Sequence, residues 1–353
     1  MAKKKPLEQL EDAVEAITTH RIPANLSTGS TLLDLAVSGE VGKAFGPGHY
    51  TLYVGDSGSG KTFLLLTMFA EAARLPFYDD YRFLYVSSEN GNQFDMERFF
   101  GRKVATRMET VQPENLEKMY DFFDKLNADG VKFIAVVDST DGMPTEAELK
   151  HIAENAKLRE KDKDTKGSYG DGKAKVHSGR LKHVVHGIEK TGSILAIISQ
   201  TRDNIDAGMF DEAKTRSGGH ALKFYAHSEI WLTVGGAIKK EANGKDRVIG
   251  HYANCDVKKN RVNGKRRRVR VALLPEFGID DMGTMFDWLK EEKFLTVSGG
   301  RINSPWYEKG YYQEELIAKL EADEREDEVR AYVQECWNKI ESELTLERKK
   351  RYE

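Results

Sequence analysis

Cysteine is scarce in this sequence, and the two cysteines present, Cys255 and Cys336, do not form a CxxC pair. A disulfide framework or a structural zinc site needs several cysteines at short spacings, so neither can be built from these two residues. A chain without such covalent staples is typical of a reducing compartment. We therefore expect the fold to depend on a hydrophobic core.

The sequence also lacks an excess of either charge and any long apolar run. Its 54 lysines and arginines oppose 57 aspartates and glutamates, a formal net charge of −3, which excludes a uniformly basic coat for nucleic acid. The longest apolar runs, at 133–137 and 194–198, fall far short of the roughly 20 residues that cross a bilayer. With 39% apolar residues in 353, the composition is that of a globular protein.

Short runs of β-branched and aromatic residues predict buried strands. They lie at 51–55, 83–89, 133–139, 194–200 and 229–234. Segments with helical spacing or helix-forming residues lie between most of them, at 61–74, 115–126 and 177–190. Strands that are apolar throughout and alternate with helices are typical of a parallel sheet covered on both faces. The predicted fold class is α/β.

Both ends of the chain differ from this central pattern. Residues 1–20 have a basic tip and then an amphipathic helical pattern, with an apolar residue every three or four positions from Leu7 to Ile17, so we expect no export signal. A lone helix cannot bury such a face, so it must dock on the core or on another subunit. After Pro275 the sequence turns to helical stretches rich in Glu and Lys, which predicts a small C-terminal unit.

A phosphate-binding motif follows the first predicted strand. The segment GDSGSGKT at 55–62 fits GxxxxGK[ST] and precedes a helical run, which is the context that the motif requires. Its backbone N–H groups would surround the phosphates, Lys61 would reach the β- and γ-phosphates, and the Thr62 hydroxyl would bind Mg²⁺. The candidate nucleotide-binding residues are Gly55, Asp56, Ser57, Gly58, Ser59, Gly60, Lys61 and Thr62.

Polar side chains end three of the other predicted strands. Asp138 ends the third strand and would support the metal with Thr62, because α/β proteins bind ligands at the carboxyl ends of their strands. Glu89 follows the second strand and could orient the water that attacks the γ-phosphate, although an acid near a helix N-cap is the alternative. Gln200, at the end of the fourth strand, could sense the γ-phosphate through a hydrogen bond.

Two further segments stand out by charge and turn residues. Residues 156–176 are rich in charge and glycine and predict a long mobile loop, either functional or merely solvated. The stretch 247–274 predicts a hairpin, with a tight type I′ turn at Asn263-Gly264. Its cations are Lys258, Lys259, Arg261, Lys265, Arg266, Arg267, Arg268 and Arg270. A charged exposed hairpin that discourages edge pairing is the simplest interpretation of this segment.

Several segments together resemble the RecA family of DNA strand-exchange recombinases. STGSTLLDLAV at 27–37 resembles the family segment ahead of the phosphate-binding loop, and SGGHALKFYA at 217–226 resembles the family's GGNALKFYA. Order and spacing agree from about residue 26 to about residue 280, and a weaker likeness runs through WYEKG at 306–310. The resemblance is closer to bacterial and phage proteins than to eukaryotic ones.

This resemblance implies a fold and a domain division. The expected fold is a RecA-like P-loop ATPase core with a mostly parallel central sheet flanked by helices, a short N-terminal helix and a small C-terminal α/β unit. The expected divisions are an N-terminal oligomerisation helix at 1–25, the core at 26–280 and a C-terminal domain at 281–353. Two DNA-binding loops would lie at about 156–176 and 201–217.

The resemblance also implies roles for single residues, with ATP and Mg²⁺ as cofactors. Glu89 matches the family's catalytic glutamate, and Gln200 matches the glutamine that links the γ-phosphate to the second DNA-binding loop. The segment VKKNRV resembles the family's VVKNKI, so Lys259 and Arg261 would reach the ATP of the adjacent protomer. Phe224 and Tyr225 would make a subunit contact.

DNA contacts are expected from both loops and from the helix after the first. The candidates are Lys175, Arg180, Lys182, Arg202, Met209, Phe210, Lys214 and Arg216. The second loop also carries Asp203, Asp206, Asp211 and Glu212, which would repel phosphates and weaken DNA binding. His177, His183 and His186 are interpreted as polar-face or DNA-proximal residues, not as a metal site.

The expected function is that of an ATP-dependent homologous recombination protein. It would form homo-oligomeric helical filaments on single-stranded DNA, pair them with double-stranded DNA and hydrolyse ATP in response to DNA. Two alternatives stay open, a hexameric DNA helicase or motor on the same core, and a nucleotide-gated DNA-binding mediator without strand exchange. A single-strand-binding protein and a loader are also expected partners, in a bacterial cytosol or a phage-infected host cytosol, without a membrane.

Overall fold

The computed structural model describes residues 25–88, 94–159, 172–203, 214–216, 219–349 and 351–352, and the following elements lie within them. The first half contains α2 (Thr31–Ser38), β1 (Tyr50–Gly55), α3 (Lys61–Ala73), a 3₁₀ turn (Pro76–Tyr78), β2 (Arg82–Ser87), α4 (Met96–Phe100), α5 (Arg102–Arg107), β3 (Met108–Val111), α6 (Leu116–Ala128), β4 (Phe133–Asp138), α7 (Glu146–Arg159) and α8 (Gly172–Thr191). The second half contains β5 (Ile194–Asp203), β6 (Lys214–Arg216), α9 (Gly219–Tyr225), β7 (Ser228–Ala242), β8 (Lys245–Asn260), β9 (Arg268–Leu274), β10 (Gly278–Ile279), α10 (Asp281–Glu291), β11 (Thr296–Ser298), β12 (Arg301–Asn303), α11 (Gln313–Ala322) and α12 (Glu326–Glu343).

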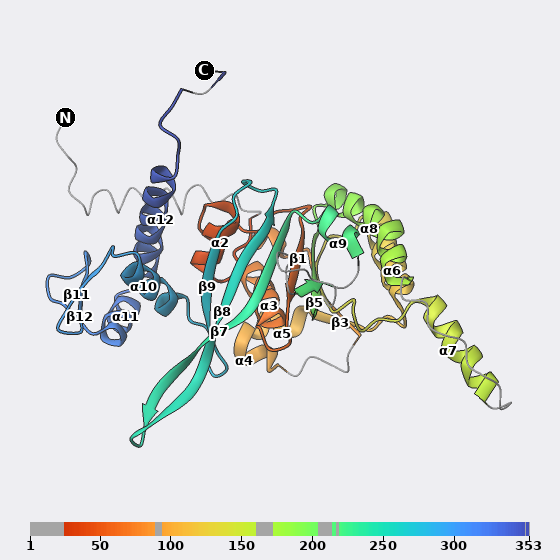
Figure 1. Cartoon of the computed structure of the whole chain (residues 1–353), viewed down its shortest axis with the longest axis horizontal. Coiled ribbons are helices and arrows are strands. Elements are labelled where there is room, and N and C mark those ends of the chain that lie inside the picture. The colour runs from red at the N-terminus through yellow and green to blue at the C-terminus, as the bar shows by residue number, and fades with distance from the viewer. Residues whose placement is uncertain are drawn as a thin grey trace.

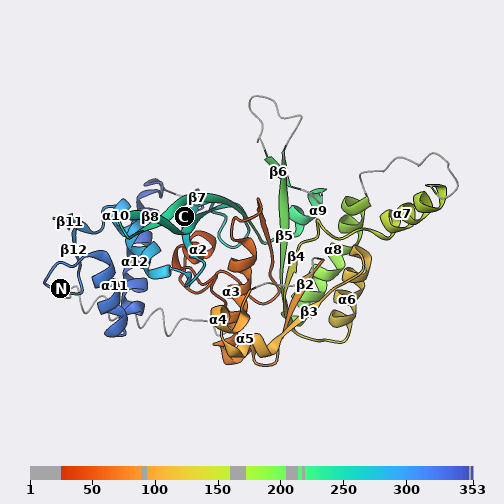
Figure 2. The same cartoon turned by 90° about the horizontal axis from the view of Figure 1, so that it is seen from below.

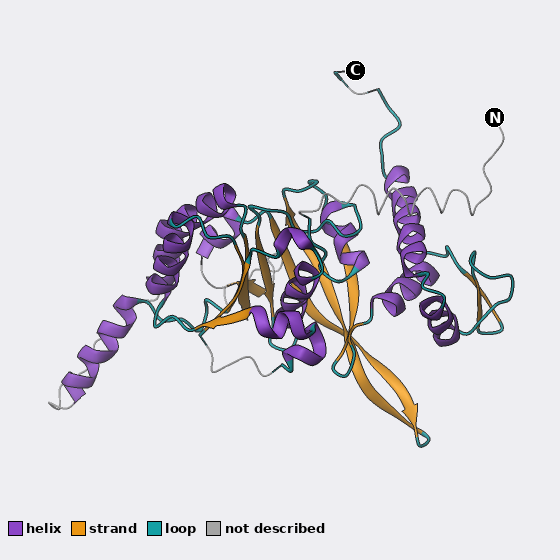
Figure 3. Cartoon of the chain, turned by 180° about the vertical axis from the view of Figure 1, so that it is seen from behind, coloured by secondary structure: helices purple, strands orange, loops and turns teal. Residues whose placement is uncertain are grey.

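A twisted central sheet organises the molecule, with helices on both faces (Figures 1 and 3). Its strand order is β10-β9-β8-β7-β1-β5-β4-β2-β3. The run from β7 to β3 is parallel, whereas β8, β9 and β10 pair antiparallel at one end. The predicted α/β class with a mostly parallel sheet is confirmed, and all five predicted strands are present.

The apolar strands are buried on both faces because alternate side chains enter two separate cores. In β4, Phe133, Ala135 and Val137 pack with α6 and α8, whereas Ile134 and Val136 pack with α3 on the other face. A continuous apolar strand is therefore needed at this position, in agreement with a parallel sheet covered on each side.

The C-terminal helices pack against the end of the sheet that carries the antiparallel strands (Figure 1). Buried side chains of α10, α11 and α12, among them Phe286, Leu320 and Trp337, belong to the same hydrophobic core as α2 and α3. On α12, the Gln334 side chain accepts a hydrogen bond from Val41 N and donates one to Gly39 O, both at 2.9 Å. At the other end of the molecule, α7 projects away from the core (Figure 2).

A two-stranded ribbon formed by β7 and β8 extends beyond the sheet (Figure 1). Ala242 pairs with Lys245, and the two residues between them, Asn243 and Gly244, have φ angles of 55° and 69°. Positive φ at both central positions defines a type I′ turn, for which Asn-Gly is the preferred pair. The sequence pattern predicts such a turn at a different pair, Asn263-Gly264.

That prediction, a tight turn at Asn263-Gly264, is wrong. Gly264 has a φ of 75°, but Asn263 is not among the described residues with positive φ, and β8 and β9 are separated by residues 261–267. Asn260 organises this wider loop, because its amide nitrogen donates to Val37 O and Lys265 O at 2.8 and 2.9 Å. These bonds fasten the loop to the end of α2.

The prediction of a loop at 156–176 is wrong at both of its ends. Helix α7 continues to Arg159 and α8 begins at Gly172, so the two ends of the predicted loop are helical. Residues 160–171 lie outside the described part of the chain, as does the predicted N-terminal helix up to residue 24.

Candidate nucleotide-binding site

The phosphate-binding motif forms the connection between β1 and α3, as predicted. Gly58 and Gly60 have φ angles of 75° and 91°, a region that residues with a side chain rarely adopt. A Cβ atom on Gly55 would lie 2.3 Å from Leu232 O on the neighbouring strand. The Ser59 hydroxyl donates to Asp56 O at 2.8 Å and closes the turn. The glycines are therefore required by the backbone path.

Lys61 is buried at the first position of α3, with 7% of its surface exposed. Its ammonium donates to Asp56 O at 2.6 Å. Burial lowers the pKa of Lys61, and the carboxylates of Asp138, Asp56 and Asp141 act in the opposite direction. A cation at a helix N-terminus, beneath the N–H groups of a glycine-rich loop, makes this end of the site suitable for phosphate.

Thr62 and Asp138 lie together, as the sequence predicted for a metal site. The Thr62 hydroxyl donates to Asp138 Oδ2 at 2.6 Å, and the Tyr85 hydroxyl donates to the same oxygen at 3.1 Å. Hydroxyl and carboxylate oxygens are the ligand types that Mg²⁺ prefers. The pair therefore fits a magnesium ion that accompanies a nucleotide. Tyr85 escaped the sequence analysis because it belongs to an apolar strand pattern.

Gln200 stands at the same edge of the sheet, because β5 pairs with β1 in a register that sets Gln200 beside Gly55. The next residue, Thr201, donates its hydroxyl to the carboxylate of Asp56 in the phosphate-binding loop. Lys61, Thr62, Asp138 and Gln200 line one cavity of about 570 Å³. Four of the predicted site residues are thus brought together from two strands, β4 and β5, and one helix, α3.

The other side of this cavity is apolar and was missed by the sequence analysis. Phe63, Phe94 and Phe99 contact one another edge to face, with ring centroids 5.5 to 6.4 Å apart. They line the cavity together with Leu273 and Pro275. These residues come from distant segments and belong to no polar motif, so only the fold reveals that they share a wall. The cavity is therefore polar at one side and apolar and aromatic at the other.

Glu89, the predicted catalytic glutamate, lies outside the described residues. The strand that leads to it is described, and Ser87 at the end of β2 is in register with Asp138 at the end of β4. The Ser88 hydroxyl donates to Ser139 O at 3.2 Å. The chain therefore reaches the cavity edge of the sheet one residue before Glu89.

Lys259 and Arg261 lie near the amino-terminal ends of the parallel strands, whereas the phosphate-binding loop follows the carboxyl end of β1. Asn260 is in register with Ser228, and Ser228 is in register with Thr51 near the start of β1, whereas Gly55 ends β1. The length of β1 places about 15 Å between these two ends. Neither cation can therefore reach the cavity of its own chain.

Both cations contact the carboxyl end of α9 instead. Lys259 donates to the carbonyl oxygens of Lys223 and Phe224, and Arg261 donates to Phe224 O at 2.9 Å. The Phe224 ring is 64% exposed beside them, and the Lys223 ammonium lies 3.2 Å from the buried carboxylate of Glu229. This surface combines exposed aromatic and cationic groups, which suits a contact with another protein.

The DNA candidates on α8 separate into two kinds. Lys175 and Lys182 are exposed and seven residues apart, so they share a face of the helix. Arg180 instead donates to the carboxylates of Asp121 and Asp124 on α6, at 2.7 and 2.8 Å. Its charge is therefore already engaged within the chain.

The second loop leaves and rejoins the sheet as a pair of antiparallel strands. Thr201 is in register with Arg216, and Asp203 with Lys214, so β5 and β6 form the base of the loop (Figure 2). The side chains of the predicted DNA contacts Arg202, Lys214 and Arg216 lie outside the described part of the structure, as do Met209 and Phe210 entirely.

The three histidines of α8 lie in different surroundings. His177 is fully buried, and its Nδ1 atom forms a 2.6 Å hydrogen bond with the Tyr120 hydroxyl, so the interpretation as a polar-face residue is wrong for it. His183 and His186 are exposed. Across the described residues, no three His, Cys, Asp or Glu side chains gather in a metal-binding arrangement. Within the same residues, each helix is too short or too polar to span a membrane.

Four of the eight cations of the basic hairpin pair with acids. Lys265 and Arg267 both bind the carboxylate of Glu341 on α12, at 2.7 and 2.5 Å. These bonds lower the pKa of Glu341 to about 2, with the Arg267 hydrogen bond as the largest cause. Further along the hairpin, Arg268 pairs with Asp256, and Arg270 pairs with Glu291. The cluster therefore serves partly to fasten the C-terminal helices.

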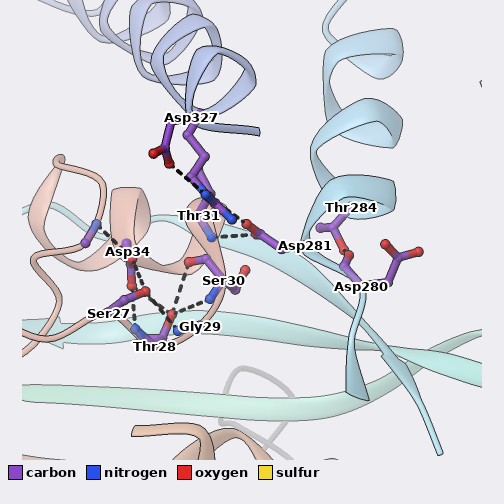
Figure 4. Close-up of polar contacts among 12 residues, drawn as sticks. Ser27, Thr28, Gly29, Ser30, Thr31, Asp34, Asp280, Asp281, Thr284 and Asp327 are labelled. Atoms are coloured by element: carbon purple, nitrogen blue, oxygen red, sulfur yellow. Dashed lines mark hydrogen bonds and ion pairs between the residues drawn. The ribbon is translucent and has the colours of Figure 1, made fainter. Parts of the chain in front are cut away.

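The STGS segment is a structural turn, in which Asp34 holds its backbone (Figure 4). The Asp34 carboxylate accepts from Ser27 Oγ, Thr28 N, Thr28 Oγ1 and Gly42 N at 2.6 to 2.9 Å. Burial raises the pKa of Asp34 to about 7, although these bonds oppose the rise. Asp281 of α10 accepts from the backbone and hydroxyl of Thr31 at 2.7 and 2.8 Å, so the segment also anchors α10.

Comparison with known proteins agrees with the fold and the motifs. The RecA N-terminal domain family matches residues 13–280. The chain is 28% identical to Protein RecA of Laribacter hongkongensis over 295 residues, which cover 80% of this chain and 71% of that protein. It is 29% identical to Protein RecA of Allochromatium vinosum over 290 residues, which cover 80% and 73% of the two chains. The resemblance expected from the sequence is confirmed, and the chain belongs to the RecA family.

Proposed function

We propose that this protein is an ATP-dependent recombinase. In this proposal it assembles as a helical filament on single-stranded DNA, pairs the strand with a homologous duplex and hydrolyses ATP in response to DNA. The proposal is carried by where one chain places the phosphate-binding cavity and where it places the two cations predicted to act on a neighbouring chain's ATP. The phosphate-binding cavity occupies one edge of the sheet, and Lys259 and Arg261 occupy the other.

The cavity fits ATP with Mg²⁺. The N–H groups of the glycine-rich loop and the Lys61 ammonium would hold phosphate oxygens, and Thr62 and Asp138 would hold the metal. The aromatic wall of Phe63 and Phe99 offers apolar ring surface to a base. Bound Mg²⁺ would neutralise charge on the phosphates. Glu89 is proposed as the residue that orients the attacking water.

The two cations of one chain would complete the site of its neighbour. A head-to-tail contact joins one edge of a chain to the opposite edge of the next, and repeats without closing when the rotation does not close a ring. In such an assembly, Lys259 and Arg261 would face the phosphates in the next chain's cavity and stabilise charge there. ATP turnover would then depend on assembly, and the exposed Phe224 would lie within the contact.

DNA would bind through the elements that border Gln200 and α8. Lys175 and Lys182 present two exposed cations on one helix face, and β5 leads from Gln200 directly into the second loop. In the proposed protein, residues 1–25 serve as the oligomerisation helix, 26–280 as the core and 281–353 as a C-terminal domain. A single-strand-binding protein and a loader are the accessory partners that such a filament would use.

The first test is ATP hydrolysis with and without single-stranded DNA. We expect DNA to stimulate turnover of the full-length chain, and Glu89→Gln to bind ATP normally while losing most hydrolysis. Glu114→Gln, which removes an exposed carboxylate before α6, is the matched control. ATP turnover that DNA does not stimulate, or that persists in Glu89→Gln, would overturn this part of the proposal.

A mixing experiment tests the shared site. Lys61→Ala lacks a working cavity, and the double variant Lys259→Ala with Arg261→Ala lacks the cations, so each should be inactive alone. In an equal mixture, about one quarter of head-to-tail contacts would join an intact cavity to intact cations. We therefore expect DNA-stimulated turnover to reappear on mixing. Two inactive variants that stay inactive when mixed would show that the cations do not act across a contact.

A ring-shaped DNA motor is the second candidate, because opposite-edge cations would complete a neighbour's site in a closed ring as well. Electron microscopy with single-stranded DNA and a non-hydrolysable ATP analogue distinguishes the two assemblies. Helical filaments are the expected result. Closed six-membered rings would favour the motor.

A further inference from the structure

The turn that follows β4 contacts three other segments, which are the end of β2, the end of the parallel part of β5 and the start of α8. Its residues, 139–142, follow Asp138 at the cavity edge of the sheet. A hydrogen bond joins Ser139 O to the Ser88 hydroxyl, and a Cβ atom on Gly142 would lie 2.5 Å from the same hydroxyl. The turn therefore packs directly against the segment that leads to Glu89. Asp141 makes the contacts with the other two segments.

The first of these contacts fixes the start of the second loop. The backbone N–H of Gln200 donates to Asp141 Oδ2 at 2.7 Å. Gln200 is the last residue of β5 in register with β1, so the chain leaves the parallel sheet at this point. A charge-assisted hydrogen bond to a backbone N–H restricts both the position of the residue and the direction of its side chain. Asp141 thereby sets where the Gln200 amide can lie in the cavity.

The second contact fixes the start of α8, directly after the first loop. The Lys173 ammonium donates to Asp141 O at 2.5 Å. Gly172, the residue before it, lies against Thr145, where an added Cβ would be 3.2 Å from the Thr145 hydroxyl. The beginning of α8 is thus held against the segment that follows β4, and Lys175 is two residues further along the same helix.

The carboxylate of Asp141 also acts on the phosphate-binding end of the cavity. Its charge is one of three that oppose the lowering of the Lys61 pKa by burial. Asp141 therefore interacts electrostatically with the nucleotide-binding lysine. Its carboxylate holds the start of the second loop, and its main-chain carbonyl holds the start of α8, after the first loop. Nothing in the sequence pattern pointed to this residue, because its partners lie 59 and 32 positions away in the chain.

We propose that Asp141 is a positioning residue that couples nucleotide binding to the two DNA-binding loops. A change at the phosphates that moves Gln200 or the 139–142 turn is passed through Asp141 to α8, and DNA bound at α8 acts on the cavity by the same route. Coupling of this kind is reciprocal, so loss of Asp141 weakens both the effect of nucleotide on DNA binding and the effect of DNA on turnover. The role in DNA coupling rests on the proposed function, whereas the mechanical link rests on the contacts alone.

Hydrogen exchange tests the link without requiring catalysis. In the wild-type chain, a non-hydrolysable ATP analogue should protect the phosphate-binding loop and also residues 198–203 and 172–180. In Asp141→Ala, protection of the phosphate-binding loop should remain while protection of the other two segments disappears. Asp141→Asn keeps a side-chain oxygen that accepts from Gln200 N, so it should restore the protection. Asp129→Ala, at an exposed turn after α6, is the control and should match the wild type.

Functional coupling is measured on the same four proteins. We expect the DNA stimulation of ATP turnover to fall about tenfold in Asp141→Ala and to recover in Asp141→Asn, consistent with the loss and the return of one hydrogen bond to Gln200 N. Full nucleotide-induced protection in Asp141→Ala, or no recovery in Asp141→Asn, would overturn the proposal. If the wild type shows the expected protection but DNA does not stimulate its turnover, the proposed recombinase function fails while the link through Asp141 stands.

Discussion

The ion pairs of Glu341 give a prediction whose size follows from the structure. The carboxylate on α12 is 12% exposed and binds both Lys265 and Arg267 of the loop between β8 and β9. Its pKa falls from 4.5 to about 2. At 1.36 kcal/mol per pH unit, this difference corresponds to roughly 3 kcal/mol in favour of the charged form in the folded state. Because Lys265 is half exposed, solvent screening reduces the expected contribution to about 2 kcal/mol.

The perturbation is Glu341→Gln, which removes the charge and keeps the shape. We expect the free energy of unfolding to fall by about 2 kcal/mol at pH 7, or the midpoint temperature by roughly 3 °C for a chain of this size. Since the folded pKa is depressed, the stabilisation is fully present above pH 4.5 and is lost as the pH falls toward 2. The difference between wild type and variant should therefore shrink progressively below about pH 4.5.

Urea unfolding followed by tryptophan fluorescence is a suitable assay, because Trp337 is on the same helix, one turn before Glu341. Glu343→Gln, an exposed neighbour near the end of α12, is the control and should change stability by less than about 0.5 kcal/mol. Either of two results would refute the reasoning that the ion pairs of Glu341 fasten α12 to the loop. One is that the two substitutions lower the free energy of unfolding equally at pH 7, and the other is that the difference between Glu341→Gln and the wild type does not change with pH.

Two other predictions address the ribbon and the DNA surface. Gly244→Ala places a side chain at a φ of 69° and should destabilise the ribbon by about 1 kcal/mol, measured as faster amide exchange there, whereas Gly236→Ala, which has open space and no positive φ, should have little effect. Lys175→Ala and Lys182→Ala should each reduce the salt dependence of single-stranded DNA binding by about 0.7 in the log–log slope. Arg180→Ala should leave that slope unchanged because its partners are acids of α6, and an equal loss in all three variants would contradict this assignment.

The sequence predicted the parallel part of the sheet and the phosphate-binding loop because their signals are local. A strand buried on both faces must be apolar throughout, and a phosphate loop must carry glycines at fixed spacing. The ends of the strands were less predictable. β7 continues to Ala242 through residues that are mostly exposed, because pairing with β8 supplies its backbone hydrogen bonds without burial of its side chains.

The position of the Asn-Gly turn and the roles of two site residues could not be predicted from the sequence, because they depend on the fold. Two Asn-Gly pairs carry the same local signal, but the one at 263–264 lies in a loop whose path is set by Asn260 and α2, far away in the chain. In the site, Tyr85 and Asp141 act through partners on neighbouring strands or helices. Their roles depend on which strands become neighbours, which no short segment of sequence encodes.

Strand exchange between a circular single strand and a homologous linear duplex tests the central claim most directly. We predict joint molecules and exchanged product that require ATP, homology and the intact chain. We also predict that Gln200→Ala binds ATP but loses exchange. DNA-stimulated ATP turnover without any homology-dependent product would contradict the assignment as a recombinase, and normal exchange by Gln200→Ala would contradict the coupling through that residue.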